Sequence, residues 1–266
     1  MVSIHEKYEV QNLLQEVSEH DPFTLERYQQ FSKLLPKAAR TVLDVGCNTG
    51  RGGSHLKAIW PAIEIFGLVQ QGGSLHTIPI RPHPPAPSPC LGEGEPDQSP
   101  STHLGEGFRV RADWYTNLRY RALDCSQKRI DVLPEAYSQG RYGLSTEIPV
   151  EDRYFDVIVA GEFLEHLYPI DVDKALCEFQ RVLKIGGRLL LTTPNPNYLK
   201  NEISKESIYC ESHLTQHFSN VLRFRLLMHG FSRVKIFGSG KVFRYLGANF
   251  PIKAVYGSYL VSADKY

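Results

Sequence analysis

One segment of the chain carries most of the information about its fold: Val42-Leu43-Asp44-Val45-Gly46-Cys47-Asn48-Thr49-Gly50. Residues 41–45 form a short apolar run that stops at Gly46, as expected of a buried parallel strand. Glycines at positions 46 and 50 let the backbone approach a ligand closely, and a helix predicted over residues 53–59 would offer free amide N–H groups. The segment predicts a strand–loop–helix unit that can bind a ligand, although a purely structural turn fits the same pattern.

Strands and helices alternate along the rest of the chain. We predict further strands over residues 63–68, 142–144, 155–160, 188–193, 233–237 and 258–263, and helices over 128–136, 171–183 and 220–229. Gly186-Gly187 should end the second of these helices and Gly230 the third, and the N-terminal helices of residues 1–37 should divide at Asp21-Pro22. This alternation predicts an α/β fold with an open seven-stranded sheet, mostly parallel with an antiparallel C-terminal strand, and helices on both faces.

Residues 69–122 interrupt this pattern. They contain eight of the chain's 17 prolines and two glycine-rich near-repeats, so they cannot bury enough apolar surface to fold by themselves. We interpret them as an insertion into a domain that spans residues 38–266. Removing them places Asp124 about 20 residues after the glycine loop, where an acidic residue that binds ribose hydroxyls is expected. A cap on the following helix is the alternative role for Asp124, and it could serve both.

Three segments resemble motifs of class I S-adenosylmethionine-dependent methyltransferases, including the type 11 and ubiquinone-biosynthesis O-methyltransferases. They are the glycine loop, the segment Glu147-Ile148-Pro149-Val150-Glu151-Asp152-Arg153-Tyr154-Phe155-Asp156, and Phe179-x-Arg181-Val182-Leu183-Lys184-x-Gly186-Gly187. The resemblance covers residues 38–68 and 123–263. It implies a Rossmann-like fold and S-adenosyl-L-methionine as cofactor.

The same resemblance implies roles for individual residues. Asp44, Gly46 and Gly50 would lie along the methionine part of the cofactor, Asp124 would hold the ribose, and Ser145-Thr146 would meet the adenine. The full set of implied cofactor contacts is Asp44, Gly46, Cys47, Gly50, Asp124, Ser145, Thr146 and Gly161. The chain has Leu144 where many members of the family have an aspartate, which puts the contact to the adenine amino group in doubt.

The segment Gly161-Glu162-Phe163-Leu164-Glu165-His166 could carry the chemistry. If a helical turn begins here, Glu162, Glu165 and His166 share one face and could hold Mg²⁺, Mn²⁺ or Zn²⁺. The spacing resembles ubiquinone-biosynthesis and small-RNA 3′-terminal 2′-O-methyltransferases; in the latter a histidine after strand five completes the metal site. His213 and His217 follow that strand here, and His217 is assigned as the fourth ligand. The alternatives are a metal-free site, with His166 as general base and Glu162 at the methyl-transfer face, or a structural role.

Composition limits the possible partners. A net charge of +1 argues against a broad nucleic-acid surface, and five scattered cysteines form no zinc or disulfide pattern. With no secretory signal and no apolar run of about 18 residues, we expect a cytoplasmic protein. We predict O-methylation of a small molecule or glycan precursor. The alternatives are a metal-assisted methyltransferase of RNA or quinone precursors, or a cofactor-binding remnant impaired by the insertion.

Overall fold

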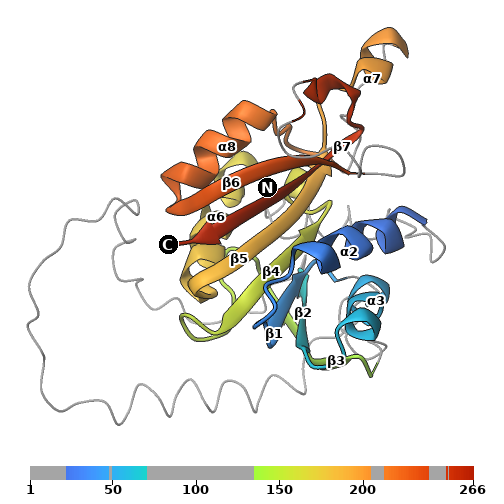
Figure 1. Ribbon diagram of the computed structural model, residues 1–266. Coiled ribbons are helices and arrows are strands. Elements are labelled where there is room, and N and C mark those ends of the chain that lie inside the picture. Colours follow the sequence, from blue (N-terminus) through green and yellow to red (C-terminus); the bar gives the residue numbers. More distant parts are fainter. Residues whose placement is uncertain (1–21, 48–49, 71–134, 205–212, 240–249, 251) are drawn as a thin grey trace, which may run out of the picture.

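The computed structural model describes residues 22–47, 50–70, 135–204, 213–239, 250 and 252–266. Its strands form one seven-stranded sheet in the order β3-β2-β1-β4-β5-β7-β6 (Figure 1). Neighbouring strands from β3 to β5 run parallel, whereas β7 runs antiparallel to both β5 and β6. The strands are β1 Thr41–Val45, β2 Glu64–Gln70, β3 Tyr137–Gly143, β4 Phe155–Gly161, β5 Leu183–Pro194, β6 Phe231–Ser239 and β7 Ser258–Lys265. The predicted fold class is confirmed.

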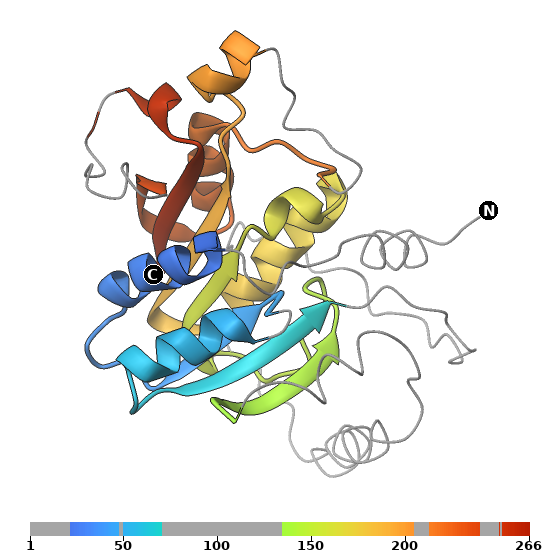
Figure 2. The ribbon, with the colours of Figure 1, turned by 90° about the vertical axis from the view of Figure 1, so that its right-hand side faces the viewer.

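Helices cover both faces of the sheet (Figure 2). On β4, Val157 and Val159 pack with α2 (Pro22–Leu34) and α3 (Arg51–Ile59), because alternate residues of a strand point to opposite faces. Ile158 and Ala160 pack on the other side with α6 (Pro169–Val182) and α8 (Ser219–Met228). Shorter elements are η2 Leu164–His166, α7 Leu199–Ser204 and η4 Lys253–Val255. In the described part of the chain, no helix has the length and apolar character that a membrane crossing requires.

The predicted helix end at Gly230 is confirmed, whereas the predicted division at Asp21-Pro22 stays a prediction because Asp21 lies outside the described residues. Helix α2 begins at Pro22, and α8 is followed by Gly230 with φ 79°, a left-handed conformation that glycine adopts without strain. The prediction for Gly186-Gly187 was wrong. Helix α6 ends at Val182, and both glycines lie within β5, in a bulge between the pairs Phe155–Leu183 and Val157–Arg188. Lys184 in this bulge binds Asp156 at 2.8 Å, which stabilises the irregular register.

The two strands beside the predicted insertion are longer than expected. Strand β2 continues to Gln70, two residues past the predicted strand end at Leu68, and pairs with β3 through Gln70 and Gly143. Strand β3 covers residues 137–143 rather than 142–144, because an edge strand needs no apolar alternation and its sequence YSQGRYG has none. Most of the predicted helix 128–136, Asp124 and residues 71–122 lie outside the described residues.

The carboxyl ends of the parallel strands meet along one edge of the sheet. The glycine loop follows β1 there, a turn over residues 144–147 follows β3, and η2 follows β4 closely. Ligands of open α/β sheets bind outside this edge. The predicted site residues within the described ranges, other than His217, belong to these three connections and to the strand ends that precede them.

Candidate active site

The glycine loop has the backbone geometry that its sequence requires. Gly46 and Gly50 have φ values of 69° and 74°, in the left-handed region that favours glycine. A Cβ atom at Gly46 would lie 2.7 Å from the Phe163 ring, so this position also needs the smallest residue. The amides of Gly46 and of buried Cys47 donate to the carbonyl of Leu68 at 2.8 and 3.4 Å, which ties the loop to the end of β2. Residues 48–49 lie outside the described ranges.

Asp44 lies directly before this loop and has no exposed surface. Its two carboxylate oxygens accept hydrogen bonds from the hydroxyls of Tyr28, on α2, and Tyr137, on β3, each at 2.5 Å. Burial raises the pKa of Asp44 to about 6, because the two hydrogen bonds only partly offset the loss of hydration. The structure therefore gives Asp44 two protein partners; its predicted contact with the methionine part of the cofactor stays a prediction.

Two glycines of α3 make room for these tyrosines. A Cβ atom at Gly52 would lie 2.2 Å from the Tyr28 ring, and one at Gly53 would lie 2.1 Å from the Tyr137 hydroxyl. The Gly53 amide, one of the free donors of the helix N-terminus, donates to that same hydroxyl at 3.1 Å. Ser138 is an extra residue in the β2–β3 pairing, a bulge of the kind that redirects a neighbouring side chain. Tyr137 was not predicted as a site residue, because its segment has no periodic pattern.

The predicted adenine contacts follow β3. Ser145, which is fully buried, and Thr146 form the tip of a turn in which the Glu147 amide donates to the Leu144 carbonyl at 3.1 Å. This turn lies at the same edge of the sheet as the glycine loop. The predicted ribose ligand, Asp124, lies outside the described residues.

The segment after β4 differs from the predicted helical turn. Glu162 has φ 50°, a strained value for a residue with a side chain, and only Leu164–His166 form a 3₁₀ turn. The Glu162 amide donates to the carbonyl and to the hydroxyl of Thr192, both at 3.0 Å, which holds this conformation. Its carboxylate lies 3.9 Å from Nε of Arg27, whose side chain lies over Gly161. The predicted helical face shared by Glu162, Glu165 and His166 is therefore wrong.

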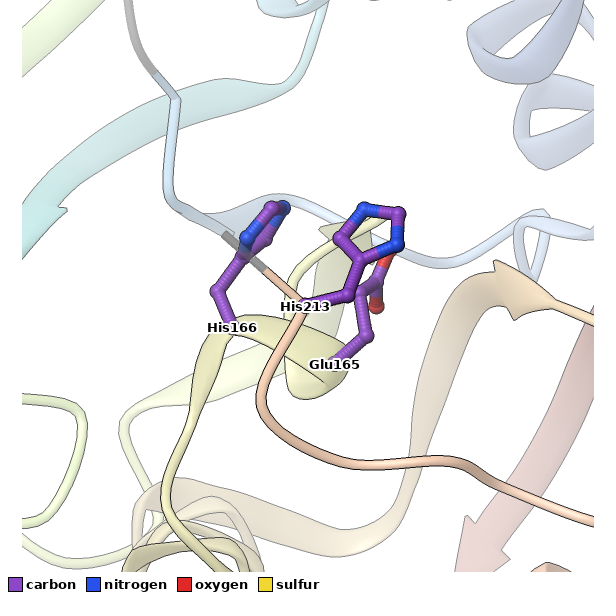
Figure 3. Close-up of side chains that lie close together, drawn as sticks. All are labelled: Glu165, His166 and His213. Atoms are coloured by element: carbon purple, nitrogen blue, oxygen red, sulfur yellow. The ribbon is translucent and has the colours of Figure 1, made fainter. Parts of the chain in front are cut away.

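A group of three ligand-type side chains nevertheless forms here. Glu165, His166 and His213 each offer one ligand atom, and these atoms all lie within 4.8 Å of one another (Figure 3). The imidazole rings of His166 and His213 meet edge to face with centroids 5.0 Å apart. His213 is brought here because the amides of Leu214 and Thr215 donate to the Glu165 carbonyl at 2.7 and 3.1 Å. Figure 3 shows the two side chains from η2 beside the one from the segment that leads towards α8.

The structure places His213, and not the predicted ligand His217, in this group. His217 is buried, and its Nε2 lies 2.9 Å from the Thr215 hydroxyl. Burial lowers the pKa of His217 to about 4, so this imidazole is neutral at physiological pH. Glu162 also lies outside the group of three ligand atoms.

Glu165 is a buried carboxylate with unusual surroundings. It is 1% exposed, neither of its oxygens accepts a well-formed hydrogen bond in the described part of the chain, and the Glu162 carboxyl lies close enough to share a proton with it. Burial raises the pKa of Glu165 well above its ordinary range, and the nearby charge of Glu162 raises it further. A buried charge without a partner is unfavourable, so this site favours a bound proton or a cation.

Comparisons with known proteins agree with this geometry. A methyltransferase-domain family model matches residues 104–191, a range that begins inside the predicted insertion and excludes the glycine loop. An S-adenosylmethionine-dependent methyltransferase from Thermotoga maritima superposes with a TM-score of 0.55 at 18% identity, covering 91% of this chain and 89% of that one. One from Archaeoglobus fulgidus gives 0.54 at 18% identity, covering 91% and 92%.

A TehB-like methyltransferase from Corynebacterium glutamicum gives a TM-score of 0.52 at 15% identity, covering 98% of both chains. At these identities the structural likeness establishes the fold alone, and the family match covers about a third of the chain. The order of the sheet and the glycine loop after β1 give the chain the fold of class I S-adenosylmethionine-dependent methyltransferases, and residues 104–191 are similar to their methyltransferase domain.

Proposed function

We propose that this methyltransferase methylates a hydroxyl group of a small molecule or glycan precursor that binds at Glu165, His166 and His213. One observation carries the proposal: a carboxylate oxygen and two imidazole nitrogens within 4.8 Å, at the sheet edge where the cofactor of this family binds. Carboxylate and imidazole ligands suit Mg²⁺, Mn²⁺ or Zn²⁺.

The residues present fit a divalent cation. Both oxygens of Glu165 are buried without a hydrogen-bond partner in the described residues, so a cation would compensate a charge that the protein leaves unpaired. Glu165, His166 and His213 would hold it, with Glu162 beside them. A bound cation would supply Lewis acidity, lowering the pKa of the acceptor hydroxyl and orienting its oxygen.

The chain's own residues have two tasks in this reaction. The first is alignment, since the acceptor oxygen must attack the methyl carbon in line with the carbon–sulfur bond that breaks. The strained backbone of Glu162, held by Thr192, fixes the segment that faces this reaction. The second is removal of the hydroxyl proton. In a site without a cation, His166, which is partly exposed beside the buried Glu165, would accept that proton.

The test is a methyl-acceptor screen with the full chain and S-adenosyl-L-methionine. The screen contains sugars and small hydroxylated compounds, with phenolic quinone precursors and short RNAs as the alternative acceptors. Enzyme dialysed against EDTA should lose most of its activity, and one of the three metals should restore it. Transfer confined to nitrogen or carbon acceptors would contradict the proposal. Full activity after EDTA would rule out the cation and leave His166 as general base.

Two histidines provide a matched pair of variants. His213→Gln removes a member of the three-residue group, and His217→Gln changes a nearby histidine that bonds Thr215 instead. We expect about a 100-fold loss of transfer rate for the first variant and little change for the second. Equal losses in both would contradict the assignment of His213.

A second candidate is a cofactor-binding remnant with impaired catalysis. The observation that favours it is that both carboxylate oxygens of Asp44 already accept hydrogen bonds from tyrosine hydroxyls, so neither is free for the cofactor. Calorimetry of the full chain with S-adenosyl-L-methionine, and a single-turnover assay on the acceptors above, separates the two. Cofactor binding without any transfer supports the remnant.

A further inference from the structure

A second group of reactive side chains lies between α6 and α8. Cys177 Sγ lies 3.4 Å from Nδ1 of His229, and Nε2 of the same imidazole lies 3.0 Å from Oδ1 of Asp173. Arg225 binds that same carboxylate oxygen with its Nε at 3.2 Å. A thiol, an imidazole and a carboxylate therefore stand in a line, with the imidazole in the middle.

Helix geometry brings these side chains together. Asp173 and Cys177 are four residues apart on α6, and Arg225 and His229 are four residues apart along α8 and its C-cap, so each pair lies on one face. Leu222 and Leu226 of α8 are buried in the core that also contains α6 residues, which holds the two helices side by side. The line of three side chains thus rests on two packed helices and not on a loop.

The arrangement is that of a nucleophile, its base and a group that orients the base. When Nε2–H of His229 donates to Asp173, the lone pair of Nδ1 faces the thiol of Cys177. Asp173 orients the imidazole and shares the same carboxylate oxygen with the guanidinium of Arg225. The thiol of Cys177 lies within hydrogen-bond distance of Nδ1 and can pass its proton to the imidazole.

The group is open to solvent at one side. The side chain of Asp173 is 45% exposed and that of His229 is 16% exposed, and Cys177 is partly exposed, whereas Cys47 is buried. Cys177 lies inside α6, where backbone amides are used in helical hydrogen bonds and cannot stabilise an oxyanion. These features favour a single covalent modification of the thiol over repeated hydrolytic turnover.

We infer that Cys177 is a modification site for a low-molecular-weight disulfide such as oxidised glutathione. Cys177 gives its proton to Nδ1 of His229, and the thiolate attacks one sulfur of the disulfide. The sulfur–sulfur bond of the reagent breaks as the new one forms, and the departing thiolate takes the proton from His229. The products are a mixed disulfide at Cys177 and one thiol. This site is separate from the methyl-transfer site and does not depend on the function proposed there.

The experiment follows the modification of each cysteine by peptide mass spectrometry. The full chain is mixed with oxidised glutathione at pH 7, and the rate at Cys177 is compared between the native protein and the protein unfolded in urea. We expect the native rate at Cys177 to exceed the unfolded rate severalfold, while Cys47 shows the opposite order because it is buried. A native rate at Cys177 below the unfolded rate would overturn the inference.

Variants test the role of each partner. His229→Gln should slow the reaction at Cys177 about tenfold, within the range by which a positioned base accelerates a reaction, and Asp173→Asn should slow it less. Lys174→Gln, which changes an exposed neighbour of Asp173 outside the line, is the matched control. The inference fails if a folded His229→Gln variant reacts as fast as the wild type.

Discussion

Two buried carboxylates at the ends of neighbouring strands have opposite surroundings. Asp44, at the end of β1, has a hydroxyl donor for each oxygen, whereas Glu165, after β4, has no hydrogen-bond partner for either oxygen in the described residues. Burial raises the pKa of both groups, to about 6 for Asp44 and well above the ordinary range for Glu165, where the charge of Glu162 also raises it. The hydrogen bonds of Asp44 thus join β1 to α2 and β3, whereas the carboxylate of Glu165 requires a proton or a cation.

The largest effect should come from removing the charge of Glu165. Glu165→Gln keeps the size of the side chain but removes a ligand and the charge at the proposed acceptor site. We expect the rate of methyl transfer to fall about 100-fold or more. The free energy of unfolding should stay equal or rise, because the variant no longer buries an unpaired carboxylate. Steady-state kinetics and urea denaturation measure the two quantities.

Glu178→Gln is the matched control for this variant. Glu178 is also partly shielded from solvent, but it accepts hydrogen bonds from the Ile148 amide and from Arg181. We expect this variant to lose stability and keep its transfer rate. A Glu165→Gln variant with wild-type kinetics would remove Glu165 from the site.

Asp44→Asn should have the next largest effect, and on stability rather than rate. Because the pKa of Asp44 is about 6 in the folded chain and 3.8 ordinarily, the folded chain binds more protons between these values. Asp44 therefore does not oppose folding at low pH, where it is protonated in both states. The folded chain loses stability as pH rises from about 4 to about 6, because the buried carboxyl group must then ionise or keep its proton at a cost. This difference in pKa corresponds to about 3 kcal/mol. Asp44→Asn should remove this pH dependence and raise the free energy of unfolding at pH 7.5 by about 1–3 kcal/mol.

Urea denaturation of the wild type and Asp44→Asn at several pH values between 4 and 8 measures this difference. Subtracting the two curves isolates Asp44 from groups with the opposite trend, such as Asp156, whose pKa is lowered mainly by its hydrogen bond from Lys184 against the effect of burial. Parallel curves for the two chains would show that Asp44 does not titrate as its environment implies. The variant should also bind S-adenosyl-L-methionine more weakly if Asp44 contacts the cofactor.

The sequence predicted the fold more completely than the site, for physical reasons. Strands β1 and β4 are buried on both faces, so their apolar runs could be read directly, whereas the edge strand β3 carries no such pattern. Glu165 and His166 were identified from local spacing. The choice between His213 and His217 depends on two backbone hydrogen bonds to the Glu165 carbonyl, which no local pattern encodes. Tyr28 was not predicted as a site residue, because its hydroxyl contact joins residues 16 positions apart.

The smallest expected changes in stability come from removing the hydroxyls of the two tyrosines that donate hydrogen bonds to Asp44. Tyr137→Phe leaves one oxygen of Asp44 and the Gly53 amide without their partners, whereas Tyr28→Phe affects only the other oxygen of Asp44. Since each buried polar group without a partner costs about 1 kcal/mol or more, we expect losses of about 2 kcal/mol for Tyr137→Phe and about 1 kcal/mol for Tyr28→Phe. Urea denaturation at pH 7.5 measures both. Equal losses would mean that the Gly53 amide finds another acceptor, and no loss in either variant would show that the tyrosine hydroxyls do not stabilise Asp44.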